Sequence, residues 1–243
     1  MKLPKNWNQL RVDQFNELWL LDEESFGSLF LYNLEVLAIV TDTDADDIDI
    51  SIEELTQCVS ELMFLRKEPH TNFKRELLNL KYKSCSKLTL GEFIDLEHYF
   101  GIDYVKNLTT IASVFYKRYK LDDFDNVIYE PYNYDPSDRA ELFDEVMVTD
   151  IYGIISEYLK FRTDFMKAYE NLFQPAIEET DEEEMDIEDK KAEEKEEQVN
   201  KWAWERMLYE LSGGDLTKIE TITDLPLIMV FNFMSMRTEL KLD

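Results

Sequence analysis

Residues 149–173 read TDIYGIISEYLKFRTDFMKAYENLF, and their large apolar side chains recur at intervals of three and four positions. The residues that set this pattern are Ile151, Ile154, Ile155, Tyr158, Leu159, Phe165, Met166, Tyr169 and Phe173. Such spacing is typical of the apolar stripe of an α-helix. We therefore predict a long helix over residues 149–173.

The composition of the whole chain favours the same secondary structure. Its 243 residues include only 6 Gly and 6 Pro, which argues against an all-β sandwich with many tight turns. They also include 15 Phe, 13 Tyr and 4 Trp, enough large apolar material for a core, whereas a disordered acidic chain would be poor in aromatic residues. We predict a mainly α fold.

Helical periodicity and capping residues mark further helices upstream of this segment. Ser51 can cap the helix that follows it, and Thr89 with Glu92 matches a capping box. The predicted helices span residues 12–21, 26–40, 52–65, 90–100, 103–118 and 137–146. Together with residues 149–173 they form a multi-helix N-terminal body.

Two segments of the body do not show this periodicity. Residues 71–88 alternate more and predict a small β-hairpin. Residues 119–136 are rich in Tyr and Asp and predict a long connection that wraps a partner or serves another function. The hairpin region is also rich in basic residues, which could meet an acidic partner, the acidic segment of the same chain, or only solvent.

An acidic segment divides the chain. Residues 178–197 contain 13 acidic residues and 3 lysines, a net charge of −10, and cannot bury themselves in a core. We predict a helical body over residues 1–174, an acidic linker over 175–199 and a C-terminal helical hairpin over 200–243.

The net charge of −27 argues against several classes of partner. A chain this acidic is repelled by the phosphates of nucleic acids and by anionic membrane surfaces. Its two cysteines make no disulfide framework, and the first ten residues, MKLPKNWNQL, lack the apolar core of a secretory leader. No apolar stretch has the roughly 20 residues that span a bilayer. We expect an intracellular protein that binds neither nucleic acid nor membrane.

One acidic turn resembles a calcium loop. Asp42, Asp44, Asp46 and Glu53 occupy positions 1, 3, 5 and 12 of a twelve-residue loop. However, Asp47 stands where a calcium loop has glycine, and we find no second loop of this type. The weak calcium candidate therefore competes with a solvated turn between helices, which we favour, and we predict no cofactor.

The sequence carries no catalytic signature. Its two histidines, His70 and His98, and its cysteines, Cys58 and Cys85, are isolated from one another and show neither zinc-ligand spacing nor a nucleophile motif. It has no phosphate-binding loop. We predict a protein that is not an enzyme.

The C-terminal module concentrates methionine and aromatic residues. Met229, Phe231, Phe233, Met234 and Met236 either pack on the helix of Trp202 and Trp204 or form part of an adaptable groove for a partner. Two helices struggle to bury this much apolar surface. We predict a partner-binding face that contains Trp202, Trp204, Leu227, Phe231 and Met234.

Three groups of motifs resemble proteins of tailed bacteriophages. They are LPKNW (residues 3–7) with VDQF (12–15), LTLGEFIDLE (88–97), and LSGGDLTK (211–218) with LPL (225–227) and VFN (230–232). The last group is similar to the C-terminal hairpin of phage tail assembly chaperones, which are small helical proteins, often acidic, that hold the tape measure protein before the tail tube polymerises around it. This chain is long for that family.

The resemblance implies a tail assembly chaperone or adaptor that binds a helical, tape-measure-like client in the cytoplasm of the bacterial host. One alternative is a structural or packaged component of the virion, which would be recovered in purified particles. A more distant alternative is an acidic inhibitor that mimics DNA, which requires acidity spread over a rigid surface. The sequence leaves the oligomeric state open.

Overall fold

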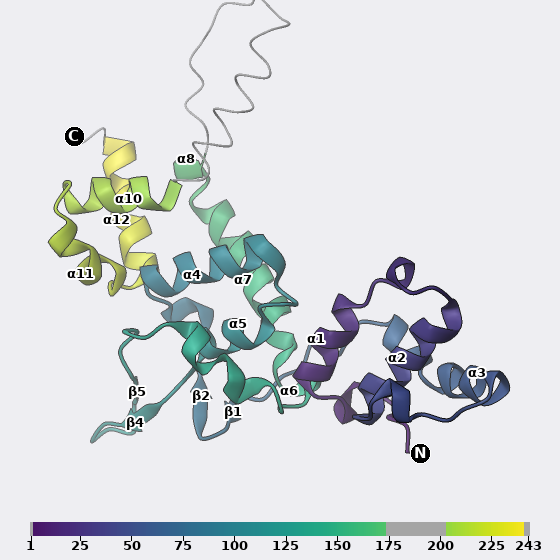
Figure 1. Ribbon diagram of the computed structural model, residues 1–243. Coiled ribbons are helices and arrows are strands. Elements are labelled where there is room, and N and C mark those ends of the chain that lie inside the picture. The colour runs from purple at the N-terminus through teal and green to yellow at the C-terminus, as the bar shows by residue number, and fades with distance from the viewer. Residues whose placement is uncertain (1, 174–202, 241–243) are drawn as a thin grey trace, which may run out of the picture. The chain divides into compact units, whose positions relative to one another are not determined.

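The structure is a computed structural model that describes residues 2–173 and 203–240 (Figure 1). Within these residues the chain is mainly α-helical with small antiparallel sheets, which confirms the predicted fold class. The predicted acidic linker, residues 175–199, lies outside the described residues, as does Trp202.

The described residues form two compact units. Unit 1 contains residues up to 85 together with 96–161, and unit 2 contains residues 86–95 and those from 162 onward. Residues 86–95 and 162–173 therefore belong with the C-terminal helices, although we predicted them as part of the N-terminal body. Helices α4 (Leu90–Asp103) and α7 (Gly153–Ala168) each contribute residues to both units.

The other elements of unit 1 follow in chain order, with η marking a 3₁₀ turn. They are η1 (Trp7–Gln9), α1 (Val12–Leu20), η2 (Glu23–Ser25), α2 (Leu29–Thr41), η3 (Ala45–Asp47), α3 (Ile52–Glu61), η4 (Met63–Arg66), β1 (Glu76–Leu77), β2 (Leu80–Tyr82), α5 (Leu108–Phe115), β3 (Tyr116–Lys117), β4 (Tyr119–Leu121), β5 (Val127–Tyr129), η6 (Pro136–Phe143) and α6 (Val148–Ile151). A further turn, η5 (Cys85–Lys87), joins the two units along the chain.

Local capping signals locate several helix starts. Ser51 Oγ accepts from the Glu54 backbone N–H, and the Glu54 carboxylate accepts from the Ser51 N–H at 3.0 Å. Thr89 and Glu92 make the same reciprocal pair, with 2.8 Å from the Thr89 N–H to the Glu92 carboxylate. Both predicted N-caps are thus confirmed, because a capping box satisfies backbone donors that the first turn leaves free.

The predicted hairpin over residues 71–88 is confirmed and gains a third strand. Strands β1 and β2 pair antiparallel, and Leu78 and Asn79 between them both have positive φ, as a tight two-residue turn requires. Strand β3 then pairs with β2, with Lys81 opposite Lys117 and Tyr82 opposite Tyr116. The predicted helix over 103–118 is wrong at both ends, because α4 continues through Gly101 to Asp103 and α5 stops at Phe115.

The segment 119–136 is not the long connection that we predicted. Strands β4 and β5 form an antiparallel hairpin within it, with Tyr119 opposite Tyr129. Asp122 supports the turn by accepting backbone N–H bonds from Phe124 and Asn126 at 2.9 and 2.8 Å. Arg139 anchors the following loop by an ion pair with Glu130 and by lying 3.5 Å from the centre of the Tyr134 ring.

The core of unit 1 surrounds α5, all of whose residues are buried. Aromatic rings stack beside it, with 5.3 Å between the ring centres of Tyr82 and Phe115. The Tyr82 hydroxyl donates to Glu157 at 3.0 Å, and Glu157 also pairs with Arg75 at 2.8 Å. This small sheet is thereby fastened to α7 by a half-buried hydrogen bond and a more exposed ion pair as well as by apolar packing.

Unit 2 is completed by one short helix before the undescribed segment, α8 (Glu170–Phe173), and by further elements after it. The latter are α10 (Ala203–Ser212), η7 (Leu216–Lys218), α11 (Ile219–Thr223) and α12 (Leu227–Leu240). Gly213 and Gly214 both have positive φ and follow the end of α10. Two backbone hydrogen bonds, Leu90 N–H to Leu225 O and Leu227 N–H to Leu88 O, tie the start of α4 to the start of α12.

Gly153 at the start of α7 provides a test of packing in unit 1. A Cβ at this position would lie 2.0 Å from the Thr71 carbonyl oxygen, whereas one at Gly101 of α4 would meet nothing within 4 Å. We expect Gly153→Ala to lower the free energy of unfolding by about 1–3 kcal/mol or more through overpacking.

Gly101→Ala is the matched control, and we expect it to raise the same free energy by up to about 1 kcal/mol because alanine favours a helix. Urea unfolding followed by circular dichroism measures both. Equal effects of the two substitutions would show that the backbone of residues 71 and 153 does not approach so closely.

Candidate partner-binding surface

The structure buries two of the predicted partner-binding residues and leaves two others half-buried. Leu227 and Phe231 are each only 1% exposed, so their placement on an open binding face is wrong. Trp204 and Met234 are half-buried. Trp202 lies outside the described residues. Of the residues that we expected either to pack inside the module or to form a groove, Phe231 is therefore packed inside.

An aromatic cluster explains this burial. The ring of Phe231 lies 4.8 Å from that of Phe165 and 5.4 Å from that of Tyr169, measured between centres. Phe93 lies 6.2 Å from Phe231 and 5.6 Å from Trp204, edge to face in both cases. These rings come from α4, α7, α10, α12 and, for Tyr169, the residue between α7 and α8, so the inner face of α12 is held by residues distant in sequence.

The opposite face of α12 carries a second set of large apolar side chains. We call it the outer stripe: Met229 is 60% exposed, Phe233 50%, Met236 43% and Leu240 61%. At 3.6 residues per turn these four positions fall within about 60° of one another around the helix axis. The buried residues of α12 fall on the other side. The helix is therefore apolar on two faces, and unit 2 covers one of them.

Polar contacts hold α12 in this orientation. Tyr169 donates its hydroxyl to Asn232 Oδ1 at 2.7 Å, and Asn171 donates its side-chain N–H to Ser235 Oγ at 3.0 Å. These bonds fix α12 against the segment around α8 and thereby fix the direction in which the outer stripe faces. A binding surface on an element already held in place loses little entropy when a partner binds.

The sequence contained a signal for the outer stripe that we did not use. Met229, Phe233, Met236 and Leu240 recur with spacings of 4, 3 and 4 residues, the repeat of a coiled-coil seam. Our prediction treats Met229, Phe233 and Met236 together with Phe231 as one group of packing or groove residues. Separating α12 into two helical faces would have assigned Phe231 and Phe233 to opposite sides.

Unit 1 contains an apolar cavity that the sequence did not indicate. Its volume is about 590 Å³. Its aromatic lining consists of Trp7, Phe15, Trp19, Tyr32, Tyr104 and Tyr152. Trp7 is held by donating Nε1–H to the Lys67 carbonyl at 2.9 Å, and burial raises the pKa of Tyr152 to about 12. Tyr152 thus stays neutral at physiological pH and offers its ring for contact, while the lining also includes the charged residues Glu23, Arg66 and Glu68.

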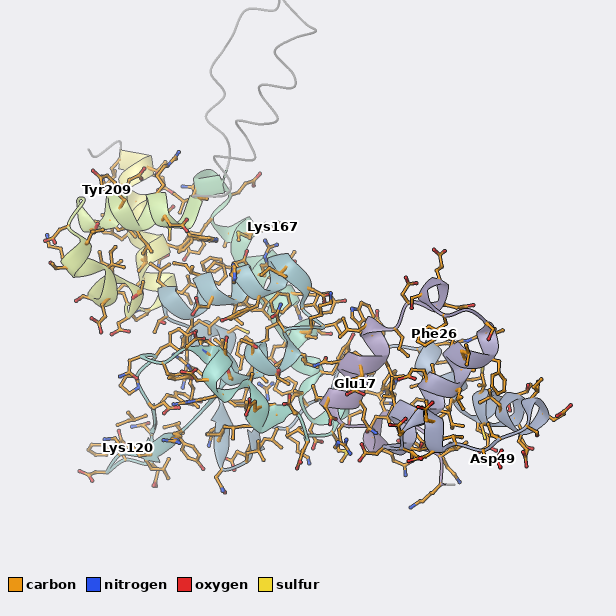
Figure 2. All side chains as sticks on the ribbon, viewed as in Figure 1. Glu17, Phe26, Asp49, Lys120, Lys167 and Tyr209 are labelled. Carbon is orange, nitrogen blue, oxygen red and sulfur yellow. The ribbon has the colours of Figure 1, made fainter. Side chains whose placement is uncertain are left out.

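The β4–β5 hairpin is a second exposed feature of unit 1. Phe124 at its tip is 84% exposed, and Lys120 of β4, labelled in Figure 2, marks its position. Hydrogen bonds from Asn126 and the Phe124 N–H lower the pKa of Asp122, which keeps that carboxylate ionised beside the aromatic tip. The tip therefore combines one apolar side chain with negative charge.

The carboxylates of the proposed calcium loop are used within the chain or face solvent. Asp42 lies 3.2 Å from Arg11, and Asp44 accepts from the Asp46 backbone N–H at 3.0 Å. Glu53 is exposed on the first turn of α3. Nowhere in residues 2–173 and 203–240 do three or more His, Cys, Asp or Glu side chains group so that they could hold a metal ion.

Cys85 in unit 1 is not activated as a nucleophile. Burial raises the pKa of the Cys85 thiol to about 11, so it remains protonated at neutral pH. Its sulfur lies 3.6 Å from the Tyr82 hydroxyl. Burial raises the pKa of Tyr82 as well, so neither group offers an anion for nucleophilic attack.

Several cations of the basic hairpin region pair with acids of the same unit. Lys74 lies 2.7 Å from Asp150, and Lys81 lies 3.0 Å from Glu76. Arg75 pairs with Glu157, as described above. These contacts favour a structural role over recruitment of an acidic partner.

Comparisons with protein-family models, with curated proteins and with solved structures find no match to this chain. Within the part of the chain that the structure describes, no helix combines the length and the apolar character needed to cross a membrane.

Two phenylalanines on α12 distinguish its inner and outer faces. Phe231→Ala removes a side chain at the centre of the aromatic cluster and should lower the free energy of unfolding by about 3–5 kcal/mol. Phe233→Ala removes a half-exposed side chain and should change it by about 0.5 kcal/mol or less. Chemical denaturation of both variants gives the two values. Similar losses would contradict the two-faced arrangement of α12.

The acidic turn predicts indifference to calcium. Because Asp42 and Asp44 already have partners within the chain, millimolar calcium should leave the melting temperature unchanged relative to a chelator-treated sample. A ligand that binds only the folded state must stabilise it. A rise of many degrees that Asp42→Ala abolishes would restore the calcium loop as a site.

Proposed function

We propose that this protein is a non-enzymatic adaptor that holds a helical client protein, in the manner of the phage tail assembly chaperones that its motifs resemble. The client would be a tape-measure-like protein, held in the host cytoplasm before the tail tube assembles. The motifs at residues 3–15, 88–97 and 211–232 support this proposal from the sequence.

The observation that carries the proposal is the outer stripe of α12. A helix that is apolar all round is expected in a buried position, and one that leaves half of that surface open is expected to have a partner. Met229, Phe233, Met236 and Leu240 lie along one line and are all partly exposed. Methionine side chains adapt their shape to varied apolar surfaces, as a chaperone for a long repetitive client requires.

Truncation of the chain before its C-terminal helices would not be a clean test of the client-binding region. A chain that ends at residue 177 would lack α10, α11 and α12. Phe93 and Phe165 would then lose their contacts with Trp204 and Phe231. Loss of binding by such a truncation would report damage to unit 2 as much as loss of a surface. The full chain is therefore the appropriate sample.

We expect the full chain, co-expressed with the tape measure protein encoded in the same genome, to co-purify with it and to raise its soluble fraction. Burial of the client's apolar residues on the adaptor would prevent their self-association. The matched control is the same tape measure protein with serine in place of its apolar heptad residues, which should not be captured. Affinity purification and mass spectrometry measure both.

Capture of both client versions in equal amounts, or of neither, would refute this function. Mass spectrometry of purified particles separates the proposal from its main alternative. Recovery of the chain at a fixed stoichiometry in mature virions would indicate a structural component instead of an assembly factor.

A further inference from the structure

We infer that the outer stripe binds a single amphipathic helix whose apolar residues repeat at spacings of three and four and whose flanks are basic. The inference rests on the proposed function for the existence of a client. It goes beyond that function by naming the surface, the form of the segment that occupies it and its charge.

The geometry of α12 specifies a helix as the occupant. The spacings of 4, 3 and 4 residues from Met229 to Leu240 place the four apolar side chains of the outer stripe along one line of the helix. At about 1.5 Å per residue the stripe is about 16 Å long, which matches three turns of a partner helix. An extended strand repeats every two residues and could not match these intervals.

The stripe is held ready for binding by the inner face of the same helix. Phe231 is locked among Phe93, Phe165 and Tyr169, and Asn232 accepts a hydrogen bond from Tyr169. Because α12 is a rigid helix, fixing its inner face fixes the opposite one. Phe233 and Met236 at the centre of the stripe are then the positions where truncation should cost most.

The charge of the chain selects the flanks of the occupant. Glu239 and Asn232 lie along one edge of the stripe and Arg237 lies along the other. The described residues of unit 2 contain ten acidic and six basic side chains, a net −4, and the undescribed run at residues 178–197 adds −10. A helix with lysine or arginine beside its apolar residues would be attracted to this acidic chain, and the stripe would supply its apolar contact.

A second copy of the chain is a poor occupant of the same face. Each copy carries a net charge of −27, so two copies repel one another. Four partly exposed side chains also fall well short of the roughly 800 Å² that each partner contributes to a typical stable interface. Only a partner of opposite charge gains electrostatic attraction to supplement this small apolar area.

The test uses two synthetic helical peptides of about four heptads, both with leucine at positions a and d. One carries lysine at positions e and g, and the other carries glutamate there. We expect the full chain to bind the lysine peptide more tightly than the glutamate peptide, with an affinity that falls as salt rises. Fluorescence anisotropy of labelled peptides measures both affinities.

The double variant Phe233→Ser/Met236→Ser should weaken binding of the lysine peptide by about tenfold or more, because central anchors carry most of the binding energy. Leu216→Ser is the matched control: this side chain is 73% exposed in unit 2 but lies on η7, outside the stripe. It should leave the affinity within about twofold of the original. Thermal unfolding checks that both variants fold. Should the double variant not fold, Leu240→Ser near the end of α12 takes its place.

Three results would overturn the inference. They are equal binding of the lysine peptide by the full chain and the double variant, preference for the glutamate peptide, and a dimer in sedimentation that the double variant abolishes.

Failure of the proposed function is a separate result. If the lysine peptide binds through Phe233 and Met236 but the tape measure protein is not captured, the surface stands and the client is wrong. If the double variant captures the tape measure protein as well as the full chain does, the client stands and the surface is wrong.

Discussion

The burial of Phe231 is the interaction on which unit 2 depends. Its ring packs against the rings of Phe93 at the start of α4, Phe165 of α7 and Tyr169 in the segment that follows α7. Each of these three residues precedes Phe231 by more than sixty positions along the chain, so no local preference could bring them to it. Once Phe231 points inward, the rigidity of an α-helix leaves Phe233 on the other side. The exposed face of α12 is thus a geometric consequence of how its buried face packs.

Local signals in the sequence were sufficient for most helix starts but not for the boundaries that depend on distant partners. The caps at Ser51 and Thr89 are confirmed, because each is settled by residues within one turn. The turn at Leu78 and Asn79 is likewise local. Tyr116 and Lys117 of strand β3 lie within the predicted helix over residues 103–118. Only their pairing with β2, more than thirty residues earlier, makes them a strand.

The division of the chain into units likewise depends on contacts between residues that are distant in sequence. The composition break at the acidic segment suggested that the C-terminal helices form a module of their own. In the structure, the Leu90 N–H bonds to the Leu225 carbonyl and the Leu227 N–H to the Leu88 carbonyl. A segment near the middle of the chain therefore completes the C-terminal unit. Charge patterning can locate a change in composition, but it cannot show which earlier segment supplies the missing core.

The candidate site could be predicted only as far as the helix that carries it. Both faces of α12 are rich in Met, Phe and Leu, so periodicity alone cannot decide which of them is buried. The distinction between Leu227 and Met229, or between Phe231 and Phe233, is made by partners on α4 and α7. The prediction named the helix that carries the candidate surface, but two of the residues that it named, Leu227 and Phe231, are buried.

The acidity of the chain gives the exposed stripe a physical context. An apolar seam with coiled-coil spacing would ordinarily associate with copies of itself, because identical seams are complementary. A net charge of −27 opposes that association at long range while leaving the seam open to a partner of the opposite sign. For the occupant that we propose, the charge that argues against nucleic acids as partners would also protect the apolar surface until a basic helix covers it. Charge would then determine which partner approaches, and the spacing of four side chains on α12 would determine whether it fits.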